Sequence, residues 1–438
     1  MTLTTPITVV RGRFLDIQKT VSQAQDIIDQ VRYIEDGVLI AEQGQILWFG
    51  TWNDAQPHLP ANIEVQHYPE QLIIPGMIDT HIHFPQTEMV GAYGEQLLSW
   101  LNTYTFPTEI QFQDPSYAQK IAEFFIQELL KNGTTTALVF CTVHPESVDA
   151  LFEAAAQQQM RLIAGKVMMD RHAPEALCDT AESAYEDSKA LIGKWHGQGR
   201  ALYAITPRFA PTSTPEQLER AGQLKAEFPD VYVHTHLSEN KDEIAWVKDL
   251  FPEQKGYLDV YHHYGLTGNR SVFAHCVHLE DAEWQCMHET DSAIAFCPTS
   301  NLFLGSGLFP LKKTWQQQVK VGLGTDIGAG TSFSLLQTVN EAYKVQQLQG
   351  DKLSAFESLY HATLGGAKAL DLDDKLGNFN VGKEADFVVL NLKPTALQQL
   401  RQSRAKSLED SLFALFTMGD DRNIEATYIY GQKAYSQS

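Results

Sequence analysis

Two histidines at the end of an apolar run are the first residues whose types and spacing could do chemistry. His81 and His83 lie two positions apart in the segment Pro75–His83, which reads PGMIDTHIH. Residues two apart in a strand point to the same face. Two imidazoles on one face form a chelating pair for a divalent metal ion. Because an H-x-H pair alone is more often an ordinary core or surface pair, this hypothesis needs further polar residues at the same place.

Three later apolar runs also end in groups that can bind a metal. They read VHTHLSE, FAHCVHL and GLGTD, and they place His236, His275 and Asp326 at their ends. The C-terminal ends of the strands of a parallel barrel lie together at one mouth, where barrel active sites are built. A buried, unpaired Asp or His is costly, and metal ligation explains why such residues are tolerated. We therefore expect these three residues to meet the two histidines of the first run.

Glu239 and His234 flank His236 and have different predicted roles. Glu239 follows His236 by three positions, and a carboxylate that lies beside a metal ion without binding it can carry protons. Its alternative role is to stabilise the N-terminus of the helix that begins in SENKDEIAWV, with Ser238 as a cap. The two roles are compatible. His234 shares the face of His236 but lies deeper, so we expect a hydrogen-bonded core residue.

The elements that must position these residues alternate between strands and helices. Helical stretches such as Tyr117–Asn132, Pro215–Phe228 and Leu335–Leu348 separate many of the apolar runs. Such alternation predicts parallel strands with right-handed crossovers. The pattern favours an α/β fold with a (β/α)8 TIM-like barrel, and a doubly wound open sheet is the alternative. The eight apolar runs are Leu72–Ile82, Thr135–Phe140, Arg161–Met169, Ala201–Phe209, Val231–Leu237, Ser271–Leu279, Ala293–Cys297 and Val319–Asp326.

Both ends of the chain have the composition of β-strands. Neither end holds enough strands for a stable sheet of its own, so we expect the two ends to combine into a small composite β-sandwich domain. The predicted ranges are 1–72 and 376–438 for this domain and 73–375 for the barrel. The segments rich in Val, Ile and aromatic residues are Ile7–Ile17, Gly37–Trp48, Ile63–Tyr68, Asp386–Leu392 and Ile424–Tyr430.

Composition and charge exclude several classes of protein. The chain has 438 residues, 33 basic and 54 acidic side chains, and a net charge of 33 − 54 = −21. Nucleic acids and anionic membranes select positive surfaces, so neither is an expected partner. Five cysteines without a C-x-x-C pair argue against a disulfide framework. We see no secretory signal and no apolar run long enough to span a membrane, and we therefore expect a cytoplasmic protein.

In its order of metal-binding residues the chain resembles the amidohydrolase superfamily, and within it the guanine deaminase family. The segment GKEADFVVLN at Gly382–Asn391 resembles the returning strand of that superfamily's composite β domain. Gln86, which follows the first histidine pair in HIHFPQ, resembles part of the family's substrate loop. Five more segments carry the likeness: Leu97–Glu109, Lys131–Ala137, Ile205–Phe209, His234–Asn240 and Gly322–Ser334.

This resemblance implies a single metal ion. Superfamily members with two metals carry a lysine at the end of the fourth barrel strand, and here that strand reads ALYAITPRF without one. The implied ligands are His81, His83, His236 and Asp326. Four ligands and a water suit zinc, one ion per chain, although iron is also possible.

The resemblance further implies hydrolytic deamination of guanine at C2, which yields xanthine and ammonia. The implied catalytic residues are Glu239, His275 and Asp326: Glu239 carries protons, and the other two flank the attacking water. A related amidohydrolase that acts on a triazine, a pterin or an adenosine-type substrate is the alternative, and a scaffold that has lost its chemistry is a second one. The family also implies a homodimer.

The implied substrate-binding residues match the groups that guanine displays. Arg208 is a planar cation suited to O6 and N7, and Gln86 can donate and accept at the edge formed by N1–H and O6. Phe209 offers an aromatic face to the purine. His236 and Glu239 complete the expected substrate-binding set.

Overall fold

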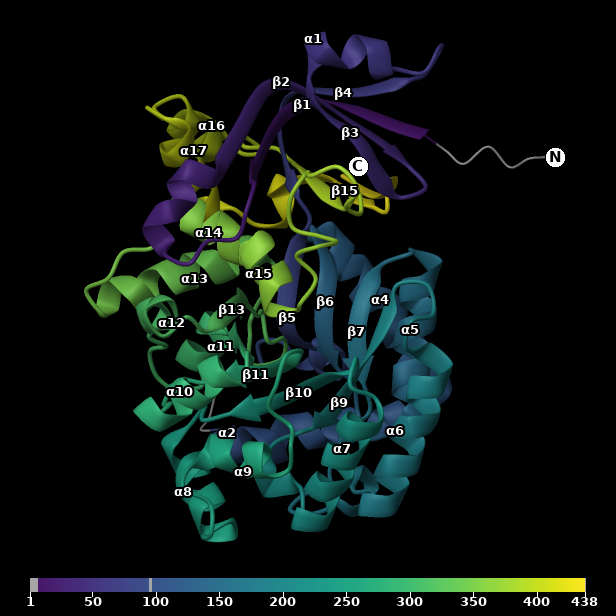
Figure 1. Cartoon of the computed structure of the whole chain (residues 1–438), viewed down its shortest axis with the longest axis vertical. Helices are drawn as coiled ribbons and strands as arrows, with labels where there is room; N and C mark the ends of the chain where they lie inside the picture. The colour runs from purple at the N-terminus through teal and green to yellow at the C-terminus, as the bar shows by residue number, and fades with distance from the viewer. Residues whose placement is uncertain (1–6, 94–96, 438) are drawn as a thin grey trace, which may run out of the picture.

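The chain folds around two separate β-sheets, which lie one above the other in Figure 1. The computed structural model describes residues 7–93 and 97–437. Residues 1–6 and 438, which the predicted domain ranges include, lie outside the described residues. One sheet is the parallel barrel sheet, and the other is a mixed sheet made from both ends of the chain. The predicted fold class, a barrel with a composite β domain, is confirmed.

Eight parallel strands follow one another around the barrel in chain order, which excludes the doubly wound open sheet. The short strand β8 (Val167–Met168) pairs with β9 beside this path. Each strand pairs in parallel with the next one along the chain, as strand–helix–strand units require. The eight strands are β5 (Met77–His83), β6 (Thr134–Phe140), β7 (Arg161–Gly165), β9 (Ala201–Pro207), β10 (Tyr232–Leu237), β11 (Ser271–His275), β12 (Ala293–Phe296) and β13 (Lys320–Leu323).

Contacts between the first and last strands close the barrel beside the predicted site. The Asp326 amide donates to the carbonyl of His81 over 2.9 Å. Thr80 Oγ1 donates to the carbonyl of Leu323 over 3.0 Å. The buried Asp79 carboxylate accepts from the side chain and the amide of Thr325. These bonds fix the ends of β5 and β13 relative to each other, and the predicted metal ligands lie at both ends.

Helices cover the outside of the barrel strands (Figure 1). Side-chain caps start several of them: Asp114, Thr180, Thr214 and Asn240 each accept a backbone N–H of the first turn, which satisfies a donor that the helix leaves open. The helices after the barrel's first strand are α2 (Leu97–Trp100), α3 (Phe106–Glu109), α4 (Pro115–Lys131), α5 (Pro145–Gln157), α6 (Ala181–Trp195), α7 (Pro215–Glu227), α8 (Lys241–Leu250), α9 (Tyr257–His263), α10 (Asp281–Glu289), α11 (Pro298–Phe303), α12 (Leu311–Gln317), α13 (Leu335–Leu348), α14 (Ala355–Ala362) and α15 (Leu364–Ala369).

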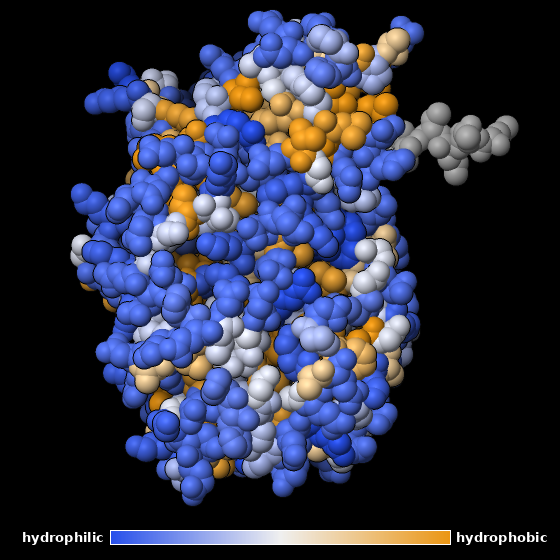
Figure 2. Space-filling view, in the orientation of Figure 1, coloured by the Kyte–Doolittle hydropathy of each residue, from blue (hydrophilic) through white to orange (hydrophobic). Residues whose placement is uncertain are grey.

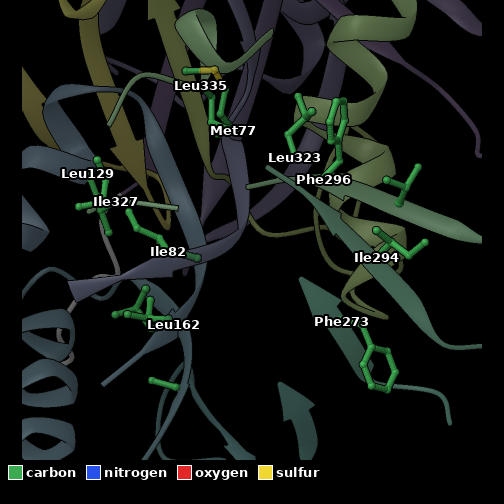
Figure 3. Close-up of a cluster of buried hydrophobic side chains, with 14 of the residues drawn as sticks. Met77, Ile82, Leu129, Leu162, Phe273, Ile294, Phe296, Leu323, Ile327 and Leu335 are labelled. Atoms are coloured by element: carbon green, nitrogen blue, oxygen red, sulfur yellow. The ribbon is translucent and has the colours of Figure 1, made fainter. Parts of the chain in front are cut away.

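Alternation along the barrel strands divides their apolar side chains between two cores. Ile82, Leu162, Phe273 and Ile294 belong to the outer core between strands and helices, part of which Figure 3 shows. The interior core holds the alternate positions and is completed by residues of α15; its members include Ile78, Leu138, Ile163, Ala204, Tyr232, Val272, Ala367 and Leu370. Because this interior is filled, we expect chemistry at the rim of the barrel, which is the general rule for the fold.

The second sheet joins strands from both ends of the chain. β4 lies between β1 and β14, so it links the N-terminal strands to the C-terminal ones. Its pairing is parallel with β1 and antiparallel with β14. The strands are β1 (Ile7–Ile17), β2 (Val31–Glu42), β3 (Gln45–Thr51), β4 (Val65–Pro75), β14 (Phe387–Leu390), β15 (Ile424–Ile429) and β16 (Gln432–Ser436), with α1 (Trp52–Ala55), α16 (Ala396–Gln402) and α17 (Leu408–Met418) outside them.

One predicted barrel strand was wrong in its extent. The apolar run Leu72–Ile82 is divided at Gly76: its first part ends β4 in the mixed sheet, and its second part is β5 of the barrel. A Cβ at Gly76 would overlap the Thr135 side chain, so a glycine allows the chain to cross closely here. Apolar composition does not mark this crossing, because both parts are buried.

Hydrophilic side chains dominate the face of the molecule in Figure 2, and hydrophobic ones gather over the mixed sheet. Within residues 7–93 and 97–437, no helix combines the length and the apolar character needed to cross a bilayer.

A largely buried charge network joins the barrel to the mixed sheet. Arg200, just before β9, donates to Glu384 over 2.6 Å and to Asp386, and Arg161 donates to Glu384 as well. Arg200 also lies over the ring of Tyr430. The two cations offset the two carboxylates, which would otherwise be buried without compensation.

We expect Arg200→Ala to lower the free energy of unfolding by about 3–5 kcal/mol, because it leaves Glu384 and Asp386 buried with one cation between them. Urea unfolding followed by fluorescence measures this loss. Arg220→Ala is the matched control, because Arg220 forms an exposed pair with Glu182 and such pairs contribute about 0–1 kcal/mol. Equal losses in the two variants would show that the network does not stabilise the junction.

Candidate active site

Four side chains from three different places in the chain meet at the C-terminal mouth of the barrel. His81 and His83 lie at the end of β5, His236 in β10, and Asp326 just after β13. Asp326 Oδ1 lies 3.1 Å from His81 Nε2 and 3.4 Å from His83 Nε2. The Nε2 atoms of His83 and His236 lie 3.2 Å apart. These are the four residues that the resemblance implies as ligands.

The protonation of these histidines suits a metal ion. Burial lowers the pKa of His81, His83 and His236 well below the ordinary value, so the rings are neutral. His236 Nδ1 donates to the carbonyl of Arg208 over 2.7 Å, and its Nε2 therefore carries a lone pair. The structure holds two groups of ligand atoms, His81–His83–His236 and His81–His275–Asp326. Within each group the ligand atoms all lie within 4.8 Å of one another.

His81 Nε2 is buried and has no hydrogen-bond partner in the described part of the chain. Neutral imidazole nitrogens that face one another and a carboxylate at these distances are the donor set of a divalent transition metal. A hydrogen-bonded second ring nitrogen is the usual way to orient such a ligand. The residues present therefore fit a single metal ion.

His234 is the core residue that its position below His236 predicts. It is fully buried, and its Nε2 lies 2.7 Å from Nδ1 of His81. Its role is thus to hold the ring of His81 in place. His278 lies beyond the end of β11 and donates from Nε2 to the carbonyl of Ser306.

The strand ends are strained where they present their side chains. Ser238, His275 and Asp326 have positive φ angles of 49°, 71° and 51°. Residues other than glycine adopt this left-handed region at a cost, and such residues cluster at functional sites. The turn at each strand end directs the polar side chain over the mouth of the barrel.

Glu239 and His275 form a second pair of ionisable groups beside the metal ligands. Glu239 is 3% exposed, and its Oε2 lies 3.5 Å from His275 Nε2. Burial raises the pKa of Glu239 above its ordinary value, although His275 opposes this effect. Burial lowers the pKa of His275, but the charges of Glu239 and Asp326 outweigh burial, so its pKa is raised.

Two neutral side chains orient this pair. Ser306 Oγ donates to Glu239 Oε1 over 3.0 Å, and His275 Nδ1 donates to the Asn301 Oδ1 amide oxygen over 2.9 Å. His275 Nε2 therefore faces Glu239 and Asp326. The arrangement can hold one or more protons between two carboxyl groups and an imidazole, as acid–base chemistry requires.

Glu243 holds the backbone that carries Glu239. Its Oε2 accepts from the amides of Glu239 and Asn240 over 3.0 and 3.1 Å, and its Oε1 accepts from the Tyr257 hydroxyl over 2.7 Å. Burial, with a smaller effect of the nearby Glu239 charge, raises the pKa of Glu243 to about 7. The helix-capping role that was one alternative for Glu239 belongs to Asn240 and Glu243, which form the capping box of α8.

A cavity opens directly on this site. Its lining combines a few convergent polar groups with an apolar wall, as small-molecule sites do. Gln86, Arg208 and Phe209, the expected substrate-binding residues, line it together with the expected metal ligands His83, His236 and Asp326. Trp100, Leu101, Leu304 and Ala329 supply the remaining, mostly apolar wall, and Glu239, Glu243 and His275 complete the lining.

Sequence reasoning missed several residues of this site. Trp100 and Leu101 belong to the segment Leu97–Glu109, where a helical turn, the π-helix η4 (Leu101–Thr105) and α3 follow one another. This segment was part of the family resemblance, but its irregular backbone has no period from which a facing side chain could be read. Asn301 and Ser306 lie beyond the end of β12, where the period of a strand no longer predicts which way a side chain points.

Comparisons with known proteins agree with this geometry. Residues 72–434 match the amidohydrolase family. The chain is 63% identical to the guanine deaminase of Escherichia coli (strain K12) over 98% of each chain. The solved E. coli guanine deaminase structure aligns with a TM-score of 0.96 at 60% identity, covering 99% of this chain and 100% of that one.

A guanine deaminase from C. acetobutylicum, solved with guanine bound in its active site, aligns with a TM-score of 0.88 at 31% identity over 98% of this chain and 100% of that one. The chain therefore belongs to the amidohydrolase family. Within that family it is similar to guanine deaminases.

We expect Glu243→Ala to lower kcat by about 10-fold or more, because a buried backbone turn loses its acceptors and Glu239 loses its fixed position. Metal content should not change. Turnover and bound metal are both measured on the purified variant.

Glu283→Ala is the matched control. Glu283 accepts from the Glu280 amide at the start of α10 and from the Leu258 amide at the start of α9, so it also holds backbone amides, outside the site. It should lower thermal stability and leave kcat unchanged. A normal kcat in Glu243→Ala would show that Glu243, like Glu283, only stabilises the fold and does not position Glu239 for catalysis.

Proposed function

We propose that this protein is a metal-dependent guanine deaminase, which hydrolyses guanine at C2 to xanthine and ammonia. One observation carries the proposal: a buried carboxyl group of raised pKa, Glu239, shares one cavity with a single-metal ligand set and with the Arg208–Gln86 pair. The similarity to guanine deaminases over nearly the whole chain supports it.

We propose zinc as the metal, one ion per chain, held by His81, His83, His236 and Asp326. Three neutral imidazoles and a carboxylate are ligands that zinc accepts in an open, catalytic site. When bound, the zinc ion would supply a hydroxide nucleophile by lowering the pKa of a water molecule toward neutrality.

Glu239 performs the proton transfers in this proposal. Its carboxylate takes a proton from the attacking water and gives it to N3 of guanine, so that no negative charge accumulates on the ring. The C2–O bond forms, and the new C2 hydroxyl gives up its remaining proton as its oxygen becomes a carbonyl. Glu239 passes a proton to the amino group, the C2–N bond breaks, and ammonia departs. A raised pKa suits both directions of transfer near neutral pH. His275 and Asp326 flank the attacking water and orient it by hydrogen bonds.

The polar edge of guanine faces Arg208 and Gln86 in the proposed complex. The Arg208 guanidinium donates to O6, and Gln86 accepts N1–H through its carbonyl oxygen. Phe209 contacts the ring face. His236 and Glu239, which line the same cavity, lie near the reacting carbon.

An ammonia-release assay across a panel of aminated rings tests the proposed function. The purified, metal-loaded protein is incubated with guanine, adenine, adenosine, an aminotriazine and a pterin, and xanthine is followed by absorbance. The proposal expects guanine to have the highest kcat/KM by a wide margin. A higher value for another ring would establish the related-amidohydrolase alternative, and no turnover of any ring would establish the scaffold.

The resemblance also leads us to propose a homodimer and a cytoplasmic location. Light scattering of the purified protein and fractionation of the producing cells test these two points.

Metal removal should abolish turnover. We expect about one equivalent of zinc in the purified protein, loss of activity with a chelator, and recovery when zinc is returned. His81→Ala should strip the metal, because it removes a ligand common to both donor groups. His263→Ala is the control, since His263 is exposed on α9. Full metal content and activity in His81→Ala would contradict the ligand assignment.

Glu239→Gln should keep metal and fold but lose about 10²–10⁴ in kcat, the usual value of general acid–base catalysis. The substitution retains an Oε1 acceptor for the Ser306 hydroxyl, so the loss reports proton transfer and not packing. Steady-state kinetics and metal analysis are measured together. Turnover near that of the wild type would remove Glu239 from the mechanism.

A further inference from the structure

Glu109 accepts hydrogen bonds from Arg208 and Gln86, the two side chains proposed to bind the polar edge of the substrate. Its Oε2 accepts from Arg208 Nη1 over 2.8 Å, and its Oε1 accepts from Gln86 Nε2 over 3.1 Å. Glu109 and Arg208 are only 1% and 3% exposed. Each oxygen of this carboxylate therefore accepts a hydrogen bond, one from a residue after β5 and one from a residue after β9.

A single helical turn presents two groups to Arg208. Phe106 and Glu109 lie three positions apart on α3, a spacing that places them on one face. The Arg208 guanidinium carbon lies 5.6 Å from the centre of the Phe106 ring. The guanidinium is thus held at its flat face and at one edge, which leaves its remaining N–H groups to point elsewhere in the cavity.

The contact with Glu109 also decides which end of Gln86 is available. A carboxylate only accepts hydrogen bonds, so the amide nitrogen of Gln86 must face it. The amide oxygen of Gln86 is then the acceptor that remains beside the donors of Arg208. An acceptor next to a donor is the complement of an N–H next to a carbonyl, the edge that N1–H and O6 of guanine form.

The charge of Glu109 changes what kind of ligand the pocket takes. A buried arginine without a partner attracts an anion strongly in a low-dielectric site. Paired with Glu109, Arg208 offers hydrogen bonds but little net positive charge. Such a pair donates hydrogen bonds to the carbonyl of a neutral base, and it does not raise the affinity for an anionic base.

We infer that Glu109 is a specificity-determining positioning residue: it orients Arg208 and Gln86 toward the N1–H/O6 edge of a neutral oxopurine and cancels the charge that would favour an anionic one. This inference rests on the proposed function. Xanthine, the expected product, is more acidic than guanine, so it ionises at a pH where guanine is still neutral. Glu109 therefore makes the site selective for substrate over the product anion.

The test compares guanine kinetics with xanthine binding in Glu109→Gln. At a pH between the ionisation of xanthine and that of guanine, KM for guanine should rise about 10- to 100-fold, the equivalent of one charged hydrogen bond, with a smaller change in kcat. The dissociation constant of xanthine, measured by calorimetry, should fall relative to that of the wild type at this pH. At a pH below the ionisation of xanthine this tightening should disappear.

Glu109→Asp separates charge from position. It keeps the negative charge but shortens the side chain, so the xanthine anion should bind as weakly as it does to the wild type, while KM for guanine rises. In an Arg208→Met background, Glu109→Gln should change the guanine KM by less than about threefold, because contacting residues that act together are not additive.

Glu384→Gln is the matched control, since it alters a buried arginine–carboxylate pair at the far junction with the mixed sheet. It should lower stability without changing the ratio of guanine KM to xanthine affinity.

Equal shifts for guanine and xanthine at both pH values in Glu109→Gln, or no shift in either, would overturn the inference. A wild-type enzyme that fails to deaminate guanine would overturn the proposed function instead.

Discussion

The rest of the structure depends on one constraint: ionisable side chains that are buried together, out of water, at one end of a closed barrel. His81, His83, His236, His275 and Asp326 are each nearly inaccessible, and burial alone would favour their neutral forms. A divalent cation held among these side chains would bind the lone pairs of the neutral rings and offset the charge of the carboxylate. The filled barrel interior and the bonds that close β5 against β13 fix this cluster in place.

Arg208 connects the two halves of the site. Its carbonyl accepts from His236 Nδ1 and so fixes the tautomer of a proposed metal ligand, while its side chain extends to Glu109 and the cavity. The turn after β9 therefore positions both the proposed metal ligand and the side chain proposed to bind the substrate. A displacement of this turn would change ligand orientation and recognition together, which explains why the structure anchors it through Thr235 as well.

The sequence predicts the parts of the site that regular structure positions. The strand period placed His81 and His83 on one face, and the common mouth of a barrel brought in His236, His275 and Asp326. The same logic could not find Glu109, Asn301 or Ser306, because each lies in a connection whose path depends on tertiary packing. It also merged β4 with β5, since composition alone does not show where a buried chain passes from one sheet to another.

The net charge of the whole chain and the charge of Glu109 in the cavity both disfavour an anionic ligand. The chain carries a net charge of −21, which repels anions near the surface within a screening length of about 8 Å at physiological salt. A neutral purine is indifferent to this field, whereas an ionised product is driven outward. Inside the cavity, Glu109 offsets the positive charge of Arg208, which would otherwise attract that anion. Entry of substrate and departure of product are thus distinguished by ionisation, although the two molecules have nearly the same shape.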